Sequence, residues 1–223
     1  MIRAVLFDAV GTVIQLREPV GETYARFARA HGVAAPPAAL QAAFPRALRA
    51  MPPMVFPGLT AAEVREAERR WWRRVVWSVF NAAGAIARFA DFEPCFGEIF
   101  AHFAGVGAWR CADGAGELLR TLRARGLRTG IVSNFDHRLP ALLGALGLAP
   151  LLDAVVLPGD AGAAKPDPGI FALALERLAV RAAEAVYVGD DADDDIAGAR
   201  RAGLRAIDVN AVGGLERIAG LLD

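Results

Sequence analysis

Short runs dominated by apolar residues recur in two separated parts of this chain, and polar residues follow several of them. The runs lie at residues 4–7, 128–132, 154–157, 185–188 and 204–209. Such runs are typical of strands that are buried on both faces of a parallel sheet. Segments with apolar residues at helical spacing alternate with the later runs, at 112–125, 139–146, 170–178 and 214–222. This order predicts an α/β fold with a Rossmann-like parallel sheet of five strands.

Residues 16–108 carry a different pattern, without strand-like runs. Their periodicity predicts four helices, at 19–31, 37–50, 60–83 and 93–104, which are separated by Pro and Gly. In the third helix Ala67, Trp71 and Val75 belong to an apolar stripe, so we expect the Trp71-Trp72 pair to be part of a core. The sequence therefore predicts a core domain, residues 1–15 and 109–223, into which a helical domain, residues 16–108, is inserted.

The charge composition of the chain indicates which kind of partner to expect. The 223 residues carry 25 basic and 25 acidic side chains, so no charge excess favours nucleic acid or a membrane, and a small molecule is the expected partner. No run approaches about 18 apolar residues and no charged leader precedes an apolar segment, so we expect a cytoplasmic protein. Nothing in the sequence requires more than a monomer, although a dimer stays open. Cys95 and Cys111 are expected to be free thiols.

Polar side chains follow the predicted strands at their carboxyl ends. Asp8 follows the first strand, Ser133 and Asn134 follow the second, and Asp190 follows the fourth. Lys165 lies in the loop after the third strand and is the only lysine among 25 basic residues. Because the carboxyl ends of parallel strands share one edge of the sheet, we expect these groups to converge. A nucleophile, hydrogen-bond donors, a cation and carboxylates together are what phosphoryl transfer requires.

An acidic cluster follows the fourth strand in the segment VGDDADDDIAGA, residues 188–199. Its five carboxylates are Asp190, Asp191, Asp193, Asp194 and Asp195. Some of them could serve the first turn of a helix, but five close to Asp8 would repel one another strongly. A hard divalent cation bound by oxygen ligands relieves that repulsion, and Mg²⁺ fits best beside a phosphate.

Four motifs, in this order, resemble those of the haloacid dehalogenase-like (HAD) hydrolases, a superfamily dominated by Mg²⁺-dependent phosphatases. They are FDAVGTVI at 7–14, IVSNFD at 131–136, AAKPDPGIF at 163–171 and VGDDADDDIAGA at 188–199. The resemblance covers nearly the whole chain. It implies that the helical insertion is a cap domain that closes over the active site of a phosphatase acting on a small phosphorylated metabolite.

The resemblance also implies a role for each matching residue. Asp8 is the expected nucleophile, which forms an aspartyl-phosphate, and Lys165 steadies its charge. The phosphoryl group is expected to be bound by Ser133, Asn134 and Lys165, together with Gly11 and Thr12 of the turn after Asp8. Mg²⁺ is expected to be held by Asp8, Asp190, Asp195 and the backbone carbonyl of Val10.

Val10 departs from the usual phosphatase pattern, which has a second Asp at this position to protonate the leaving group. Valine moves no proton, and general acid–base catalysis contributes about 10²–10⁴-fold, so we expect slow turnover or a restriction to good leaving groups. Two alternatives stay open. A 2-haloacid dehalogenase needs no such acid but has little use for the acidic cluster, and a non-catalytic metal-binding module would keep the fold and the metal site without turnover. A phosphonate-cleaving relative is strongly disfavoured because residues 16–108 lack a lysine.

The sequence does not identify the substrate. Arg17, Trp72, Arg73 and Arg74 are candidates for contacts from the helical domain, and for each of them a solvated or packed surface position is the alternative.

Overall fold

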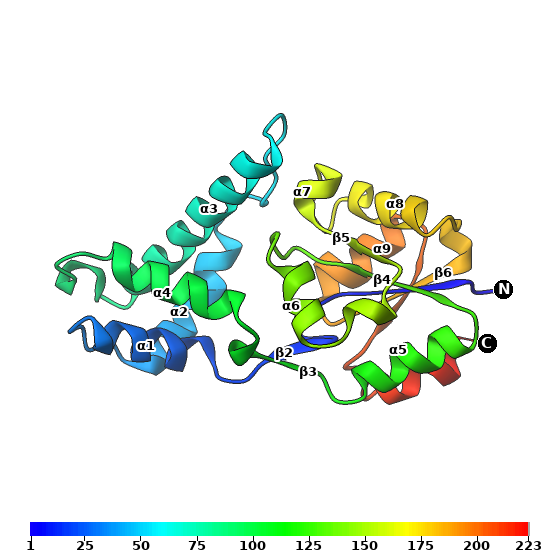
Figure 1. The fold of residues 1–223 in the computed structure, drawn as a ribbon, viewed down its shortest axis with the longest axis horizontal. Helices are drawn as coiled ribbons and strands as arrows, with labels where there is room; N and C mark the ends of the chain where they lie inside the picture. The colour runs from blue at the N-terminus through cyan, green and yellow to red at the C-terminus, as the bar shows by residue number, and fades with distance from the viewer. Residues whose placement is uncertain (223) are drawn as a thin grey trace. The chain divides into compact units, whose positions relative to one another are not determined.

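The chain forms two compact units, which the computed structural model describes over residues 1–222 (Figure 1). The sheet unit comprises Met1–Gln15, Met54–Pro57 and the chain from Arg110 onward. The helical unit comprises Leu16–Pro53 and Gly58–Trp109. The short segment Met54–Pro57 groups with the sheet unit, and this departs from a helical domain that runs unbroken from 16 to 108.

Five parallel strands form the centre of the sheet unit, in the order β5-β4-β1-β6-β7. They are β1 (Ala4–Phe7), β4 (Arg128–Val132), β5 (Ala154–Val156), β6 (Ala185–Gly189) and β7 (Arg205–Asp208). In the middle strand, Phe7 is in register with Ile131 of β4 and with Val188 of β6. The α/β fold with a five-stranded parallel sheet is therefore confirmed.

Helices cover both faces of this sheet, which explains why the central strands β1 and β6 are unbroken apolar runs. On one side lie α5 (Ala115–Ala124) and the C-terminal 3₁₀ helix Leu215–Leu221, and on the other lie α8 (Pro168–Arg177) and α9 (Gly198–Arg201) (Figure 1). The remaining helices of the unit are α6 (Leu139–Ala145) and α7 (Pro158–Ala161). On the α8 side Leu6, Phe171 and Tyr187 share one fully buried core cluster.

The helical unit is built from α1 (Val20–Ala30), α2 (Pro37–Arg49), α3 (Ala61–Ala82) and α4 (Glu93–Ala104). Its core is aromatic: Tyr24 stacks on Phe80 with ring centroids 5.8 Å apart, and Phe92 stacks on Phe96 at 6.3 Å. Trp71 is buried and its Nε1 donates to the carbonyl of Pro52 at 2.8 Å. The apolar stripe of the third helix is therefore a core-facing surface, as its spacing predicts.

Four segments of the described chain differ from the predicted elements. Short strands β2 (Ile14–Leu16) and β3 (Trp109–Cys111) pair where the chain passes between the units, and three residues are too few to show a period in the sequence. The segment after β6 forms a π-helix, Ala192–Ala197, before α9 begins. The expected C-terminal helix is of the tighter 3₁₀ type.

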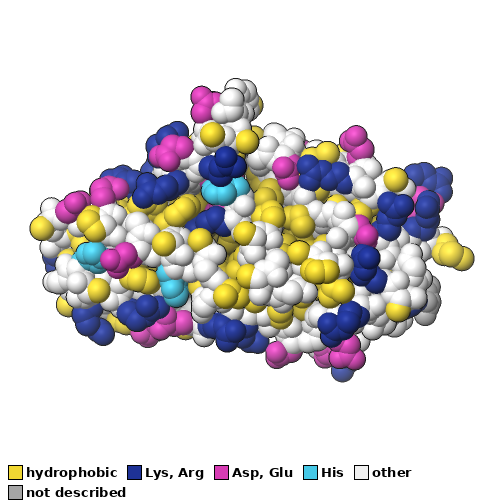
Figure 2. Space-filling view, in the orientation of Figure 1, with side chains coloured by type: hydrophobic (Ala, Val, Ile, Leu, Met, Phe, Trp, Pro, Cys, Tyr) yellow, Lys and Arg dark blue, Asp and Glu magenta, His cyan; other side chains and the backbone are white. Residues whose placement is uncertain are grey.

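Charged side chains of both signs are interspersed over the face drawn in Figure 2, in keeping with the equal numbers of acidic and basic residues. Among residues 1–222, none of the helices is both long enough and apolar enough to cross a bilayer.

Candidate active site

Three of the side chains selected from the sequence lie at the carboxyl ends of adjacent strands. Asp8 follows β1, Ser133 follows β4 and Asp190 follows β6. The backbone N–H of Asp8 continues the sheet by donating to the carbonyl of Val188 at 2.9 Å. Because β4 and β6 flank β1, these strand ends meet at one edge of the sheet, where open α/β sheets bind ligands.

Lys165 lies between two carboxylates. Its Nζ donates to Oδ1 of Asp8 at 2.5 Å and to Oδ1 of Asp195 at 2.6 Å. Burial alone lowers the pKa of a lysine, but the negative charges of Asp8 and Asp195 outweigh burial here and raise the pKa of Lys165. Lys165 is therefore a permanent cation held directly beside Asp8.

Asp8 has one carboxylate oxygen engaged and one free. Oδ1 accepts from Lys165, whereas Oδ2 accepts no hydrogen bond from the part of the chain that the structure describes. Burial raises the pKa of Asp8 to about 6; Lys165 opposes this rise, and the charges of Asp195 and Asp190 add to it. Asp8 is thus largely ionised at neutral pH and poorly solvated, as a carboxylate nucleophile should be.

The turn after Asp8 is shaped to meet Asp190. Gly11 has φ of 95°, and a Cβ at this position would lie 2.4 Å from Oδ2 of Asp190. The next residue, Thr12, is buried, and its hydroxyl donates to Oδ1 of Asp190 at 3.1 Å. Gly11 and Thr12 therefore orient Asp190. The substrate contacts expected of these two residues stay a prediction.

Asp195 holds the acidic loop together. Its Oδ2 accepts from the backbone N–H groups of Asp190 and Asp191, both at 3.1 Å. Its Oδ1 accepts from Lys165 and from the hydroxyl of Tyr187, at 2.6 and 2.8 Å. Gly189 permits this close approach, because a Cβ there would lie 2.4 Å from Oδ2 of Asp195. With two hydrogen bonds on each oxygen, Asp195 suits bracing the loop better than direct metal ligation.

Three carboxylates could contribute to a cation site at this edge. Asp8, Asp190 and Asp195 each offer an oxygen, and these atoms lie within 4.8 Å of one another. Lys165 balances only part of their charge, and burial raises the pKa of Asp190. An all-oxygen donor set of this charge fits a hard divalent cation such as Mg²⁺.

Val10 lies in the same turn and is 38% exposed. Three backbone hydrogen bonds hold the turn: the N–H groups of Val13 and Ile14 both donate to the carbonyl of Ala9, and the N–H of Gly11 donates to the carbonyl of Ile14, all at 2.9 Å. None of these hydrogen bonds within the turn uses the carbonyl of Val10 as an acceptor. That carbonyl is compatible with the metal role expected for it, whereas the side chain offers no proton.

Ser133 and Asn134 contribute differently. Ser133 is buried, and its hydroxyl makes no hydrogen bond within residues 1–222, so it is available to a ligand. Asn134 is engaged with the backbone of Lys165: its Oδ1 accepts from that N–H at 2.8 Å and its Nδ2 donates to that carbonyl at 2.9 Å. Asn134 therefore fixes the loop that carries Lys165, in addition to the phosphoryl contact that the resemblance implies for it.

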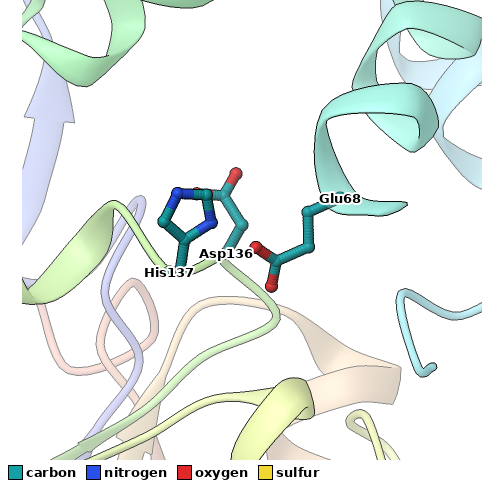
Figure 3. A group of neighbouring side chains, drawn as sticks. All are labelled: Glu68, Asp136 and His137. Carbon is teal, nitrogen blue, oxygen red and sulfur yellow. The ribbon is translucent and has the colours of Figure 1, made fainter. Parts of the chain in front are cut away.

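The structure adds residues that the sequence analysis did not select. Asp136 is fully buried, and its Oδ1 accepts from the backbone N–H and the Nε of Arg138, at 3.0 and 2.8 Å. Figure 3 shows Asp136 and His137 on this loop and Glu68 on α3. Glu68 belongs to the helical unit, so we infer no site from these three side chains. The signal for Asp136 was its place within the IVSNFD motif.

Most candidate contacts from the helical unit have partners within that unit. The Nε of Arg17 donates to the carbonyl of Trp109 at 2.7 Å, and Arg73 forms an ion pair with Glu93. Trp72 packs edge-on against Trp71 with centroids 5.1 Å apart, and Arg74 is exposed. These positions agree with packed or solvated surface side chains, the alternative considered for each of them.

A family model described as haloacid dehalogenase-like hydrolase matches residues 2–203. The chain belongs to this family. The family membership that the four motifs indicated is thus confirmed, together with the α/β fold. The activity is correspondingly that of a hydrolase, for which a small-molecule substrate is expected.

This HAD hydrolase is similar in sequence to proteins with different names. The haloacid dehalogenase-like hydrolase domain-containing protein 3 of Homo sapiens is 38% identical over 211 residues, which cover 92% of this chain and 80% of that protein. A phosphoserine phosphatase of Thermus thermophilus is 41% identical over 91 residues, which cover 40% of this chain and 36% of that protein.

Solved structures of both phosphatases and dehalogenases share the fold. The 2-haloacid dehalogenase of Pseudomonas syringae has a TM-score of 0.65 with 26% identity, over 100% of this chain and 98% of that one. A HAD phosphatase of Thermococcus onnurineus has a TM-score of 0.60 with 24% identity, over 99% and 98%. The fold therefore does not choose between the two reactions, and the site residues must.

Proposed function

We propose that this HAD hydrolase is a Mg²⁺-dependent phosphatase that acts on a small phosphorylated metabolite through Asp8. The observation that carries the proposal is the environment of Asp8: one oxygen is paired with Lys165, the other is free, and Asp190 lies close by. A dehalogenase has little use for this concentration of carboxylates. The phosphoserine phosphatase relative gives further support.

In the first step Oδ2 of Asp8 attacks phosphorus. The new O–P bond forms as the bond to the leaving oxygen breaks, and the leaving group departs with the electron pair. Lys165 compensates the negative charge beside Asp8, and the hydroxyl of Ser133 is free to donate to a phosphoryl oxygen. The product is an aspartyl-phosphate at Asp8. In the second step water attacks that phosphorus, releases phosphate, restores the Asp8 carboxylate and gives its proton to solvent.

Asp8, Asp190 and the carbonyl of Val10 are the groups we propose to hold Mg²⁺, with Asp195 bracing the loop. When bound, the cation supplies charge neutralisation for a dianionic phosphate approaching several carboxylates. Thr12 and Gly11 contribute by fixing Asp190 relative to Asp8.

Val10 shapes the choice of substrate within this proposal. The leaving oxygen receives no proton from this side chain, so esters whose leaving groups are stable as anions are the favoured substrates. Acyl phosphates and aryl phosphates meet this condition. We also propose that the helical unit is the cap, since its chain is inserted between β2 and β3, directly after the segment that carries Asp8.

The proposal is tested with purified protein and an aryl phosphate. Phosphate release is expected with Mg²⁺ and is expected to disappear with EDTA or in Asp8→Asn. Asp113→Asn is the matched control, because the Asp113 side chain is 98% exposed, and it should retain full activity. Release that survives EDTA or Asp8→Asn would overturn the mechanism.

A dehalogenase is the second candidate, favoured by Val10, and the solved 2-haloacid dehalogenase shows that the fold is compatible with it. There Asp8 would displace halide from C2 of a haloacid and form an ester, a step that needs no proton donor. Halide release from a 2-haloacid in EDTA, together with no phosphate release, would select this function over the phosphatase.

A further inference from the structure

Tyr187 joins three segments of the site although the sequence analysis did not select it. It lies on β6 and is fully buried. Its hydroxyl is 3.1 Å from Nζ of Lys165, 2.8 Å from Oδ1 of Asp195 and 3.0 Å from the carbonyl of Val132. These partners come from the loop before α8, the π-helix after β6 and the end of β4.

The hydroxyl of Tyr187 is needed for every N–H donor of the Lys165 ammonium to have an acceptor. A lysine ammonium has three N–H donors and no acceptor. One donor meets Asp8, one meets Asp195 and the third meets the oxygen of Tyr187. The tyrosine hydroxyl accepts from Lys165 and has one hydrogen of its own, which it can donate to Asp195 or to the carbonyl of Val132.

The ring of Tyr187 is itself held in place. It meets the ring of Phe171 on α8 edge-on, with centroids 5.1 Å apart, and both residues belong to the core cluster on that side of the sheet. Core packing therefore fixes the hydroxyl before any ligand arrives, and the hydroxyl in turn fixes the direction of the ammonium.

We propose that Tyr187 is the positioning residue that aims Lys165 at Asp8. The inference rests on the proposed function insofar as Lys165 acts on the reacting phosphoryl group. Tyr187 is fully buried and acts through Lys165, so its hydroxyl should affect the chemical step more than substrate binding. Without it, one ammonium N–H has no partner in a buried site, and the ammonium can turn away from Asp8.

Tyr187→Phe removes the hydroxyl and keeps the ring that packs on Phe171. Its kcat for an aryl phosphate is expected to fall roughly tenfold, while KM stays within about twofold. Tyr24→Phe is the matched control, because Tyr24 is the only other tyrosine, is also buried and lies in the core of the helical unit. Thermal unfolding of both variants shows that the fold is retained.

A second measurement reports on the ammonium without using activity. Since Lys165 is the only lysine, protein grown with ¹⁵N-labelled lysine gives a single side-chain ammonium signal. In the wild type and in Tyr24→Phe we expect this signal to show slow exchange of its hydrogens with solvent. In Tyr187→Phe we expect exchange about tenfold faster, because the third hydrogen bond is lost.

The two readouts separate this inference from the proposed function. If the wild type releases no phosphate but Tyr187→Phe exchanges faster, the phosphatase is wrong and the positioning role stands. If the wild type is active but exchange in Tyr187→Phe is unchanged, the positioning role is wrong and the phosphatase stands. An unchanged kcat in an active Tyr187→Phe enzyme would likewise overturn the positioning role.

Discussion

Two single positions in the turn after β1 set the chemistry expected of this HAD hydrolase. Val10 offers a carbonyl to the site but no proton, while Gly11 allows the turn to approach Asp190. One position therefore limits the rate of the proposed reaction, and the other permits the geometry that the reaction needs.

Val10→Asp is expected to raise phosphate release from an alkyl phosphate by roughly tenfold or more, because it supplies the missing proton donor. Val10→Asn is the matched control, since its amide has nearly the same shape but transfers no proton, and it should stay near the wild-type rate. Steady-state phosphate assays at several pH values check this. An unchanged or lower rate in Val10→Asp would mean that another group already serves as the acid.

Gly11→Ala is expected to lower phosphate release at least tenfold and to cost about 1–3 kcal/mol of stability, because a Cβ there meets Asp190 and φ is positive. Gly97→Ala on α4 is the control, since its Cβ would meet no atom within 4 Å. That variant should gain about 0.5–1 kcal/mol from helix propensity. Activity and denaturant unfolding are measured together. Wild-type activity in Gly11→Ala would contradict the role assigned to this turn.

At the scale of elements, helix α4 buries a cysteine side chain and thereby lowers the reactivity of its thiol. Its residue Cys95 is fully buried, and burial raises the pKa of its thiol to about 12. The nearby charge of Glu98 acts in the same direction. Cys111, on β3, is half-buried, and neither cysteine is in a disulfide.

A thiol reagent at pH 8 is expected to label Cys111 and to spare Cys95. A thiol with pKa about 12 is thiolate in only roughly one molecule in ten thousand at pH 8, and that fraction rises as pH rises. Mass spectrometry after timed labelling checks this. In Cys111→Ser no fast-reacting thiol should remain until the protein is unfolded in guanidinium; rapid labelling of that folded variant would contradict the burial of Cys95.

Across the whole molecule, acidic and basic residues balance, yet carboxylates concentrate at one edge of the sheet. Lys165 offsets part of that charge. Mutual repulsion of the remaining carboxylates opposes folding, so a cation bound there should stabilise the native state.

Added Mg²⁺ is therefore expected to raise the melting temperature. At a free concentration of 100 times Kd the native state gains about 2.7 kcal/mol, which corresponds to several degrees for a chain of this size. Asp190→Asn should lose this response while its melting temperature without Mg²⁺ stays equal or rises, because one repelling charge is gone. Differential scanning calorimetry with and without Mg²⁺ checks both points. A full Mg²⁺ response in Asp190→Asn would exclude Asp190 as a ligand.

Much of the fold was predictable because buried strands and helices have a recognisable pattern of apolar residues in the sequence. Strands such as β1 and β6 are covered on both faces and appear as unbroken apolar runs, and α3 shows its buried stripe at helical spacing. The convergence of Asp8, Ser133 and Asp190 followed from topology, since parallel strands share an edge. Short or irregular segments such as β2, β3 and the π-helix were not predictable, because they are too brief to show a period.

The residue types at the site and the order of their motifs could be predicted from the sequence, since each motif consists of residues that are close together in the chain. The different structural roles of these residues could not be predicted. Asp195 and Asp190 look alike in the sequence, yet Asp195 accepts four hydrogen bonds, one of them from Lys165 at a distance of 30 positions in the chain, whereas Asp190 is half-buried. Tyr187 appears as one more residue of an apolar strand, and its partner Lys165 lies 22 positions away. Such roles arise from contacts between distant segments, which no local pattern records.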